Sequence, residues 1–368
     1  MRFFWLVPVL LPACALAQTH APAERPAVPG WPLTGAVPYP SFAGEVRLAN
    51  VRKLTHGGQN AEAYFSADGR RLVFQSTPQG GGCDQIFVMD VDGGNLSRVS
   101  TGEGRTTCGY FFPAGDRVLY SSTHHLDPTC PAPPDRSRGY VWPLHPYDIF
   151  VAGPGGEGTR RLTDAPGYDA EATFSPDGSR IVFTSTRDGD VELYTMTADG
   201  GDVRRLTFEE GYDGGAFFSP DGTRIVYRAW HPADPAEVAD YRALLADRLV
   251  RPGRMELWIM DADGGNRRQV TAGGGASFAP FFHPDGRRIV FASNLHDPRG
   301  RDFDLYMVNT DGGGLERITH HGEFDGFPMF SADGRRLVWA SNRGGGVPGE
   351  TNVFIADWVE SGVPQPVP

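Results

Sequence analysis

The sequence predicts an all-β protein that folds as a six-bladed β-propeller with four strands in each blade. The first observation is a motif of the type Phe-Ser-Pro-Asp-Gly that occurs six times in order along the chain. The second is that each copy is followed by the same series of short apolar runs and Gly-rich turns. The third is the composition: 48 Gly and 31 Pro among 368 residues break helices but suit tight turns between short strands.

The repeat unit has a basic period in the mid-forties. Three copies of the motif keep the Pro-Asp-Gly sequence, two replace Pro by Ala, and one reads Phe-Pro-Ala-Gly-Asp. The spacings between the six Phe positions are 47, 62, 44, 64 and 48 residues, so two units carry insertions. The copies begin at Phe65, Phe112, Phe174, Phe218, Phe282 and Phe330.

Each unit predicts four strands. The Ser-Pro-Asp-Gly segment suits a tight turn, and its Asp is interpreted as a turn former rather than a calcium ligand. Two apolar runs follow, of which residues 181–185 and 192–196 are typical, and then come an Asp-Gly-Gly hairpin turn and a short strand ending in Leu-Thr. The apolar runs are nearly continuous, which is typical of sheets covered on both faces by neighbouring sheets.

The two ends of the repeat region predict how the ring closes. A closing strand at Val51–Thr55 precedes the first complete unit, whereas the last unit stops at Trp358, where its own closing strand is due. We therefore expect the N-terminal strand to complete the last blade beside the strand around Asn352–Asp357. This pairing removes the open sheet edges of a broken ring.

The N-terminus has the pattern of a secretory signal peptide over residues 1–17. Arg2 supplies the charged region, a short apolar run follows, and Ala15-Leu16-Ala17 forms a small-x-small cleavage site. A lipid anchor on Cys14 is the less favoured alternative. The expected divisions are this signal, a Pro/Ala-rich tether at 18–49, the propeller at 50–358 and a tail at 359–368, with the protein exported to the periplasm.

Export permits disulfides, and cleavage of the signal leaves Cys83, Cys108 and Cys130. With three cysteines, one internal bridge at most can form. We expect Cys108 to be a member of it, because Cys108 lies between the other two in the sequence.

The repeated Phe-Ser-Pro-Asp-Gly, Leu-Tyr-x-Met-x-x-Asp-Gly-Gly and Arg-Arg-Leu-Thr elements resemble the repeats of bacterial TolB-type propellers over residues 50–358. The resemblance implies a six-bladed periplasmic propeller. The α/β domain that precedes the propeller in TolB is not recognised here, so partner contacts made through that domain are not carried over. Similar repeats occur in propellers of prolyl-oligopeptidase-like enzymes and oligogalacturonate lyases, so the repeat alone does not determine function.

Function is expected on the face that carries the loops between the second and third strands of each blade, called here the ligand face. Both insertions fall there, at about 121–147 and 229–254, and long loops on a rigid scaffold often carry function. The second insertion predicts a helix capped by Asp234, with Pro235 in its first turn and an apolar stripe. The stripe consists of Val238, Tyr241, Leu245 and Leu249.

The candidate site is the mouth of the central channel, because homologous positions of a ring converge on its axis. Carboxylates at the starts of the innermost strands are expected to gather there and to favour a cation or a basic ligand group. Arg187 and Arg343 are either part of this site or partners that neutralise it. His320 and His321 are the candidate ligands of a divalent metal, the one cofactor that the pattern suggests. The carboxylates are Glu62, Asp169, Glu171, Asp213 and Asp325.

Two functional hypotheses remain open. The favoured one is a non-catalytic binding or scaffold propeller that recognises a protein, peptide or glycan. The alternative is a metal-assisted enzyme acting on a carbohydrate or polyanion, with oligogalacturonate lyases as the analogy. The formal net charge of -11 disfavours nucleic-acid binding. No G-x-S-x-G or H-E-x-x-H motif supports a serine hydrolase or a zinc peptidase.

Overall fold

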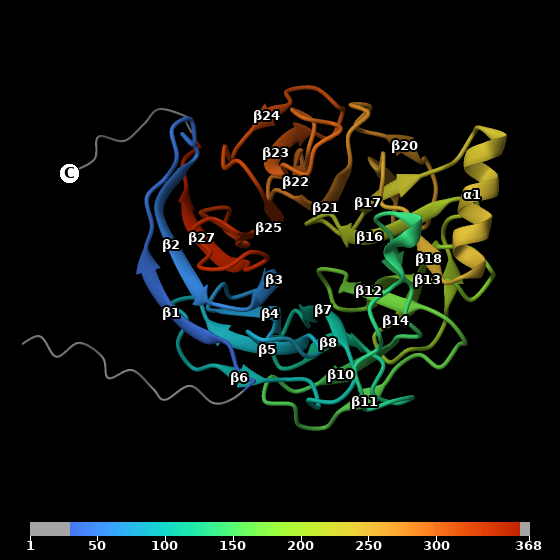
Figure 1. The fold of residues 1–368 in the computed structure, drawn as a ribbon, viewed down its shortest axis with the longest axis horizontal. Helices are drawn as coiled ribbons and strands as arrows, with labels where there is room; N and C mark the ends of the chain where they lie inside the picture. Colours follow the sequence, from blue (N-terminus) through green and yellow to red (C-terminus); the bar gives the residue numbers. More distant parts are fainter. Residues whose placement is uncertain (1–29, 361–368) are drawn as a thin grey trace, which may run out of the picture.

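The computed structural model describes residues 30–360, which form a closed ring of six antiparallel sheets around a central axis (Figure 1). The prediction of a six-bladed propeller is confirmed. Every blade follows the same order, with its first strand innermost. Blades 1 to 3 consist of β3 (Gln59–Phe65), β4 (Arg71–Thr77), β5 (Gln85–Asp90) and β6 (Ser97–Arg98); β7 (Thr106–Phe111), β8 (Val118–Ser122), β10 (Asp148–Ala152) and β11 (Arg160–Arg161); and β12 (Asp169–Phe174), β13 (Arg180–Ser185), β14 (Glu192–Thr197) and β15 (Arg204–Arg205).

The sixth blade differs from the others because the two ends of the chain meet in it. Its outer strands come from the N-terminal side of the propeller, so it has five strands instead of four. Blades 4 to 6 consist of β16 (Tyr212–Phe218), β17 (Arg224–Trp230), β19 (Glu256–Asp261) and β20 (Arg268–Gln269); β21 (Ser277–Phe282), β22 (Arg288–Ser293), β23 (Asp304–Asn309) and β24 (Glu316–Arg317); and β25 (Asp325–Phe330), β26 (Arg336–Ser341), β27 (Asn352–Trp358), β2 (Leu48–His56) and β1 (Leu33–Pro38).

The ring closes as the ends of the repeat region predict. Strand β2 pairs antiparallel with β27, and Lys53 lies opposite Phe354. Strand β1 then pairs with the outer edge of β2, within the predicted tether. Strand β1 also contacts blade 1, because Ala36 N within this strand donates to the carbonyl of Asp92. The otherwise open edge of β2 explains why this short segment is a strand.

The two recurring motifs have structural roles. In the Ser-Pro-Asp-Gly turns, the Ser hydroxyl donates to the Asp carboxylate, at 2.6 Å between Ser175 Oγ and Asp177 Oδ1. In the Leu-Thr segments, the Thr hydroxyl binds a polar residue at the start of the third strand, as Thr163 does with Asp148 at 3.1 Å. The interpretation of the Asp residues as turn formers therefore fits these hydrogen bonds. In blade 2 it is Phe111, rather than Phe112, that occupies the motif's Phe position, opposite Val118.

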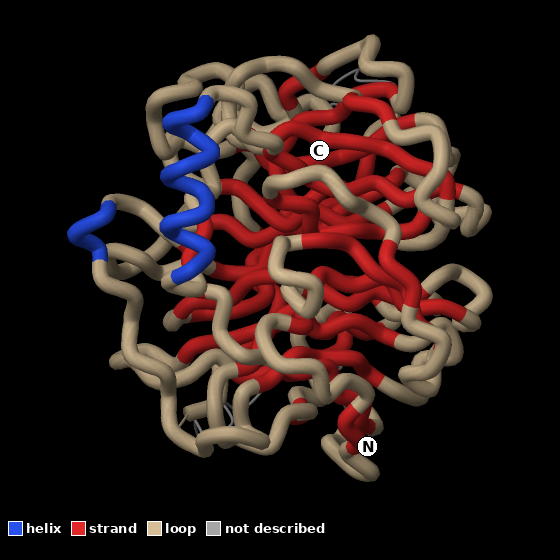
Figure 2. The backbone as a smooth tube through the Cα atoms, turned by 90° about the vertical axis from the view of Figure 1, so that its right-hand side faces the viewer, coloured by secondary structure: helices blue, strands red, loops and turns tan. Residues whose placement is uncertain are grey.

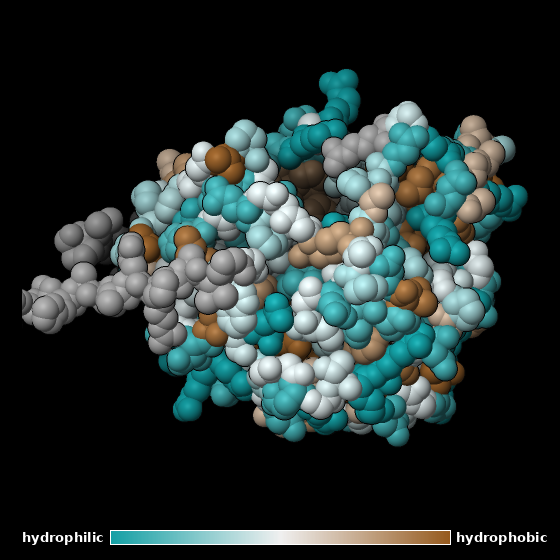
Figure 3. All heavy atoms as spheres, turned by 60° about the horizontal axis from the view of Figure 1, so that its bottom comes forward, coloured by the Kyte–Doolittle hydropathy of each residue, from teal (hydrophilic) through white to brown (hydrophobic). Residues whose placement is uncertain are grey.

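The core lies between the blades, where the nearly continuous apolar runs are buried on both faces. Phe74, Phe183, Phe291 and Trp339, all from second strands, are fully buried. The surface in Figure 3 is mostly hydrophilic, and hydrophobic residues on that face are scattered. Within residues 30–360, no helix is long and apolar enough to cross a bilayer.

The two insertions form one substructure, which we call the lid. Helix α1 (Pro235–Ala246) is capped by Asp234, which accepts from Ala236 N at 2.7 Å, as predicted. It lies outside the stacked strands (Figure 2). Two short strands, β9 (Trp142–Pro143) and β18 (Leu249–Val250), join the first insertion to the second. The first insertion also holds the 3-10 helix Arg136–Arg138.

The disulfide prediction is only partly correct. One bridge exists, but it joins Cys83 to Cys130, with 5.4 Å between their Cα atoms. Cys108 is free. The expectation that Cys108 is a member of the bridge is wrong because Cys108 lies on the innermost strand β7 and faces the axis. Cys83 and Cys130 instead lie in the loops between the second and third strands of two adjacent blades. The predicted signal peptide lies outside the described residues, as does nearly all of the predicted tail.

Candidate functional site

A backbone irregularity recurs in all six innermost strands and shapes the centre of the molecule. The pairing of each innermost strand with its neighbour shifts register at one point, as between Ala61 and Tyr64 in blade 1. One residue at each shift has a positive φ, between 51° and 61°. Only one of the six is glycine, so the ring carries backbone strain at five positions. The six residues, called here the axial ring, are Glu62, Cys108, Glu171, Gly215, Ala279 and Phe327.

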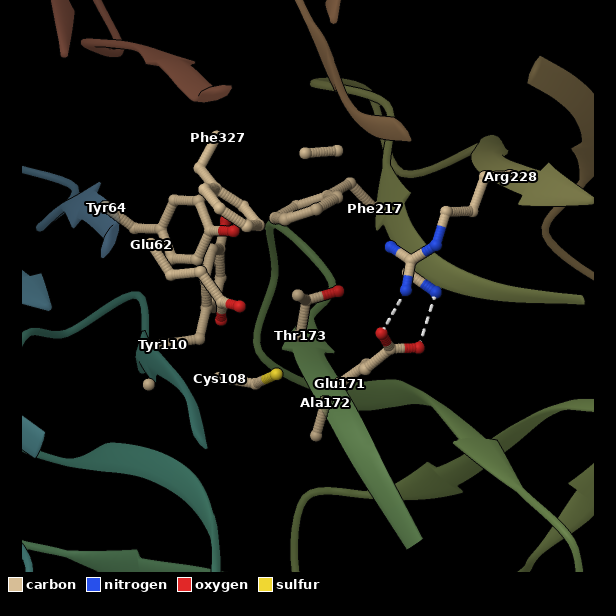
Figure 4. Close-up of a pocket in the computed structure, with 13 residues that line it drawn as sticks. Glu62, Tyr64, Cys108, Tyr110, Glu171, Ala172, Thr173, Phe217, Arg228 and Phe327 are labelled. Atoms are coloured by element: carbon tan, nitrogen blue, oxygen red, sulfur yellow. Dashed lines mark hydrogen bonds and ion pairs between the residues drawn. The ribbon is translucent and has the colours of Figure 1, made fainter. Parts of the chain in front are cut away.

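The axial ring surrounds a small cavity on the propeller axis. All six of its residues line the cavity, together with side chains from the next layer of the inner strands (Figure 4). The cavity volume is about 30 Å³, which is room for one or two water molecules. Six homologous positions therefore enclose a small chamber on the propeller axis. This chamber contains two carboxylates and one thiol.

One carboxylate of the chamber is fully engaged. Glu171 forms an ion pair with Arg228, and both side chains are about nine-tenths buried (Figure 4). The carboxylate also accepts from Thr184 Oγ1 at 2.7 Å and from Gly215 N at 2.9 Å. Arg228 in turn donates to the hydroxyl of Tyr212 at 2.6 Å. Glu171 thus belongs to a polar network between blades 3 and 4.

The other carboxylate has no cationic partner. Within residues 30–360, no ion pair includes Glu62. Burial raises the pKa of Glu62 to about 7, and the negative charge of Glu171 adds to the increase, while a hydrogen bond from Cys108 opposes it. Burial also raises the pKa of the Cys108 thiol well above its ordinary value. Near neutral pH, Glu62 exchanges a proton readily and Cys108 stays a thiol.

Aromatic side chains close one side of the chamber. The rings of Tyr64, Tyr110 and Phe217 pack edge to face or tilted, with centroids 5.5 to 5.9 Å apart. Phe217 contacts Phe281 at 5.4 Å, which extends this layer to blade 5. Phe327 of the axial ring lies beside them in Figure 4. These aromatic rings form an apolar wall of the chamber.

The lid borders the chamber on the ligand face. The guanidinium of Arg228 lies over the ring of Trp142 from the first insertion, 5.4 Å from its centroid. The neighbouring Tyr140 is 56% exposed and contacts Arg301 of blade 5 at 5.6 Å. The second insertion is anchored on the rim, where the hydroxyl of Tyr241 lies within hydrogen-bonding distance of Asp190 and of the carbonyl of Gly211. Two segments about a hundred residues apart in sequence thus meet beside the chamber.

The predicted gathering of carboxylates at the channel mouth is only partly found. Glu62 and Glu171 line the chamber, but Asp169 does not. Asp169 is buried in its own blade, where Arg187 Nη2 contacts both its oxygens at 3.0 Å. In a regular strand, residues two positions apart point the same way, so Asp169 and Glu171 would both face the axis. They do not, because the register shift between Ala170 and Thr173 interrupts the alternation.

The remaining predicted carboxylates are likewise paired within their surroundings. Asp213 is buried and accepts from His231 Nε2 at 3.2 Å. Asp325 contacts Arg343 at 2.6 Å, and Arg343 also contacts Glu45, which precedes β2, at 2.9 Å. Asp325, Arg343 and Glu45 form a buried triad. Arg187 and Arg343 therefore act as neutralising partners rather than as groups facing the chamber.

The predicted histidine pair lies away from the axis. His320 N donates to Glu45 at 3.3 Å, and the ring of His321 contacts Phe42 at 5.2 Å. Among the described residues, the group with a spacing suited to a metal ion contains neither of them. That group lies in blade 5, and the guanidinium of Arg317 contacts one of its carboxylates. It consists of His296, Asp302 and Asp304.

The sequence patterns did not identify two groups of the chamber, Cys108 and Arg228, or Trp142, which packs against Arg228. Cys108 was considered only as a disulfide partner, and Arg228 and Trp142 were not singled out. The sequence does contain a pattern that marks these positions. Each residue of the axial ring stands three positions before the motif's Phe of its own repeat, or before Phe111 in blade 2. Neither the register shift nor the contact between the insertions follows from a local pattern.

Comparisons with known proteins agree with this architecture. The TolB β-propeller domain family matches residues 145–243 and 250–357. The Tol-Pal system protein TolB of Bordetella pertussis is 47% identical over 53 residues, which are 14% of this chain and 12% of that protein. The TolB homologue of Chlorobium luteolum is 26% identical over 45% of this chain and 44% of its own length. The chain thus spans less than half the length of these curated relatives.

Solved structures share the fold. The putative TolB of Agrobacterium tumefaciens superposes with a TM-score of 0.55 at 20% identity, over 84% of this chain and 94% of that one. An oligogalacturonate lyase in complex with manganese gives a TM-score of 0.52 at 17% identity, over 90% and 99%. The fold is therefore shared by a putative TolB and by an oligogalacturonate lyase, so it does not by itself determine function. The family match covers more than half of the sequence, and the chain belongs to the TolB β-propeller domain family.

Proposed function

We propose that this protein is a non-catalytic binding propeller of the periplasm, which recognises a protein, peptide or glycan on its ligand face. The observation that carries the proposal is the unpaired Glu62 carboxylate in the axial chamber, beside a lid built from both insertions. The Bordetella pertussis relative is named as a protein of the Tol-Pal system, which supports a role in protein binding. The pattern of a signal peptide supports export.

The chemistry of the chamber favours binding over catalysis. Its thiol is protonated at neutral pH, so Cys108 is a poor nucleophile. One of its two carboxylates is occupied by Arg228. Glu62 alone remains free to change its charge, which suits the recognition of a cationic group rather than a two-residue acid and base mechanism.

The alternative is a metal-assisted enzyme on a carbohydrate or polyanion. Two observations favour it: the similarity in fold to oligogalacturonate lyases, and the metal-compatible group in blade 5. The ion pair between Arg317 and Asp304 weighs against it, because the guanidinium already neutralises that carboxylate.

Site-specific photo-crosslinking distinguishes the ligand face from the opposite face. A photoreactive residue at Tyr140, which is 56% exposed in the lid, is compared with one at Leu315, which is 53% exposed in a turn of the opposite face. We expect a discrete crosslinked partner from position 140 in periplasmic extract and none from position 315. Equal labelling at both positions contradicts the proposal. Stoichiometric metal together with cleavage of polygalacturonate supports the enzyme instead.

A further inference from the structure

We infer that the axial chamber binds a primary ammonium group at the end of an unbranched chain, as presented by a lysine side chain or by the N-terminal glycine of a peptide. This inference rests on the proposed function and names the chemical class of the group that enters the site. It is carried by the charge of the chamber, by its aromatic wall, by its size and by the strained ring that builds it.

The charges of the chamber leave one negative charge without a partner. Glu171 and Arg228 neutralise each other as an ion pair. Glu62 has no cation within the described residues, and the neighbouring donor that lowers its pKa is the weakly donating thiol of Cys108. A monovalent cation beside Glu62 balances the chamber, whereas a carboxylate or phosphate adds repulsion from two glutamates.

The aromatic wall suits the same ligand. Tyr64, Tyr110, Phe217 and Phe327 line the chamber that contains the Glu62 carboxylate (Figure 4). The faces of aromatic rings attract cations electrostatically, and the attraction increases where water is excluded. A carboxylate facing aromatic rings is therefore a favourable environment for an ammonium group.

The size of the chamber selects among cations. A volume of about 30 Å³ accepts a group comparable to one or two water molecules. An ammonium group on a narrow methylene chain meets this limit. A planar guanidinium or a trimethylammonium group is too large to enter without rearrangement of the wall.

The backbone shows that the chamber is a built feature. Residues other than glycine occupy five of its six left-handed positions, a conformation that such residues keep only where the surrounding structure imposes it. The register shift at each position turns the side chain toward the axis, where Glu62, Cys108 and Glu171 meet from three blades. Bulges of this kind are common beside functional sites, where they redirect a side chain.

Calorimetric titration of the full chain tests the inference. The probes are N-acetyl-lysine N-methylamide for a lysine side chain and glycinamide for a terminal amine, with N-acetyl-norleucine N-methylamide as the neutral analogue. At pH 7.5 we expect saturable binding of at least one cationic probe and at least tenfold weaker binding of the neutral one. The stronger cationic probe identifies the source of the ammonium group. Equal binding of the neutral analogue overturns the inference.

Two variants locate the binding. Glu62→Gln is expected to weaken binding of the cationic probe at least tenfold, while Glu103→Gln, which removes one exposed carboxylate from the same face, leaves it unchanged. Binding to the wild type is also expected to weaken at least tenfold from pH 7.5 to 5.5, since Glu62 becomes protonated. The other groups facing it are Glu171, Arg228, Cys108, Tyr64 and Tyr110, with Asp84 also contributing through its charge. Unchanged binding by Glu62→Gln refutes the assignment.

The free thiol supplies a second measurement if Glu62→Gln folds poorly. In a chain carrying Cys14→Ser, the Cys108 thiol first gives its proton to water, and the small thiolate fraction attacks the sulfenyl sulfur of a methanethiosulfonate. The new disulfide forms as the thiosulfonate S–S bond breaks, and methanesulfinate leaves. We expect the cationic aminoethyl reagent to react at least tenfold faster than the anionic sulfonatoethyl reagent, after correction for their intrinsic rates. An equal or inverted ratio contradicts the inference. If the chamber binds the ammonium probe but position 140 crosslinks no partner, the proposed function is wrong and the inference stands. If position 140 crosslinks a partner but the chamber binds no ammonium probe, the inference is wrong and the proposed function stands.

Discussion

The buried triad at the closure of the ring predicts that Arg343→Met destabilises the protein strongly. Arg343 and Asp325 are fully buried, and Glu45 is 3% exposed. Removing the guanidinium leaves two buried carboxylates side by side without a cation. Removing one partner of a buried ion pair typically costs about 3–5 kcal/mol.

The expected change in melting temperature follows from the size of the fold. The structure describes residues 30–360. With about 2.1 cal/mol/K per residue, a chain of this size has a total unfolding entropy of about 0.7 kcal/mol/K. Dividing the expected loss of stability by this entropy gives a melting temperature that is lower by roughly 4–7 °C. The assay is differential scanning calorimetry at pH 7.5.

A matched control and a rescue make the experiment decisive. Arg335→Met removes an exposed arginine of the same blade and is expected to change the melting temperature by less than about 1 °C. Adding Glu45→Gln and Asp325→Asn to Arg343→Met is expected to restore part of the loss, because the charges no longer repel. A melting temperature of Arg343→Met equal to that of the control refutes the reasoning.

Three further predictions concern closure, the disulfide and pH. Deleting residues 50–56 removes the strand that pairs with β27, and thermal denaturation should show a melting temperature at least roughly 10 °C lower or no cooperative transition; an unchanged value contradicts the closure role. Replacing Cys83 and Cys130 by Ser opens a 47-residue loop, which is expected to cost about 4 kcal/mol in urea denaturation, while thiol titration of the Cys14→Ser chain should find one free thiol. Burial raises the pKa of Glu62 from 4.5 to about 7, so between these pH values the native state binds more protons than the unfolded state. The contribution of Glu62 to the free energy of unfolding therefore falls as pH rises from about 4.5 to about 7. Glu62→Gln is therefore expected to be more stable than the wild type by about 1–3 kcal/mol at pH 8 and equal to it near pH 4.5, and a constant difference across this range would argue against a raised pKa.

Two features of the candidate site show where local patterns stop being informative. The cap of α1 at Asp234 is specified by adjacent residues, and it forms as predicted. The direction of Asp169 depends on a register shift produced by packing of the inner strands around the axis, and the alternation rule fails there. Arg228 belongs to the site because it contacts Glu171 of the neighbouring blade, which is 57 residues away in sequence.

By itself, the sequence determined the repeat, the number of blades, the strand that closes the ring and the face that carries the insertions. These properties depend on periodicity and on turn residues, which act over a few positions. Only the tertiary structure decided that Cys83 pairs with Cys130, that the insertions join beside the axis, and that Glu62 remains without a cation while Glu171 gains one. The physical reason is that contacts across a ring join residues from different repeats, so their geometry depends on how all six blades pack together.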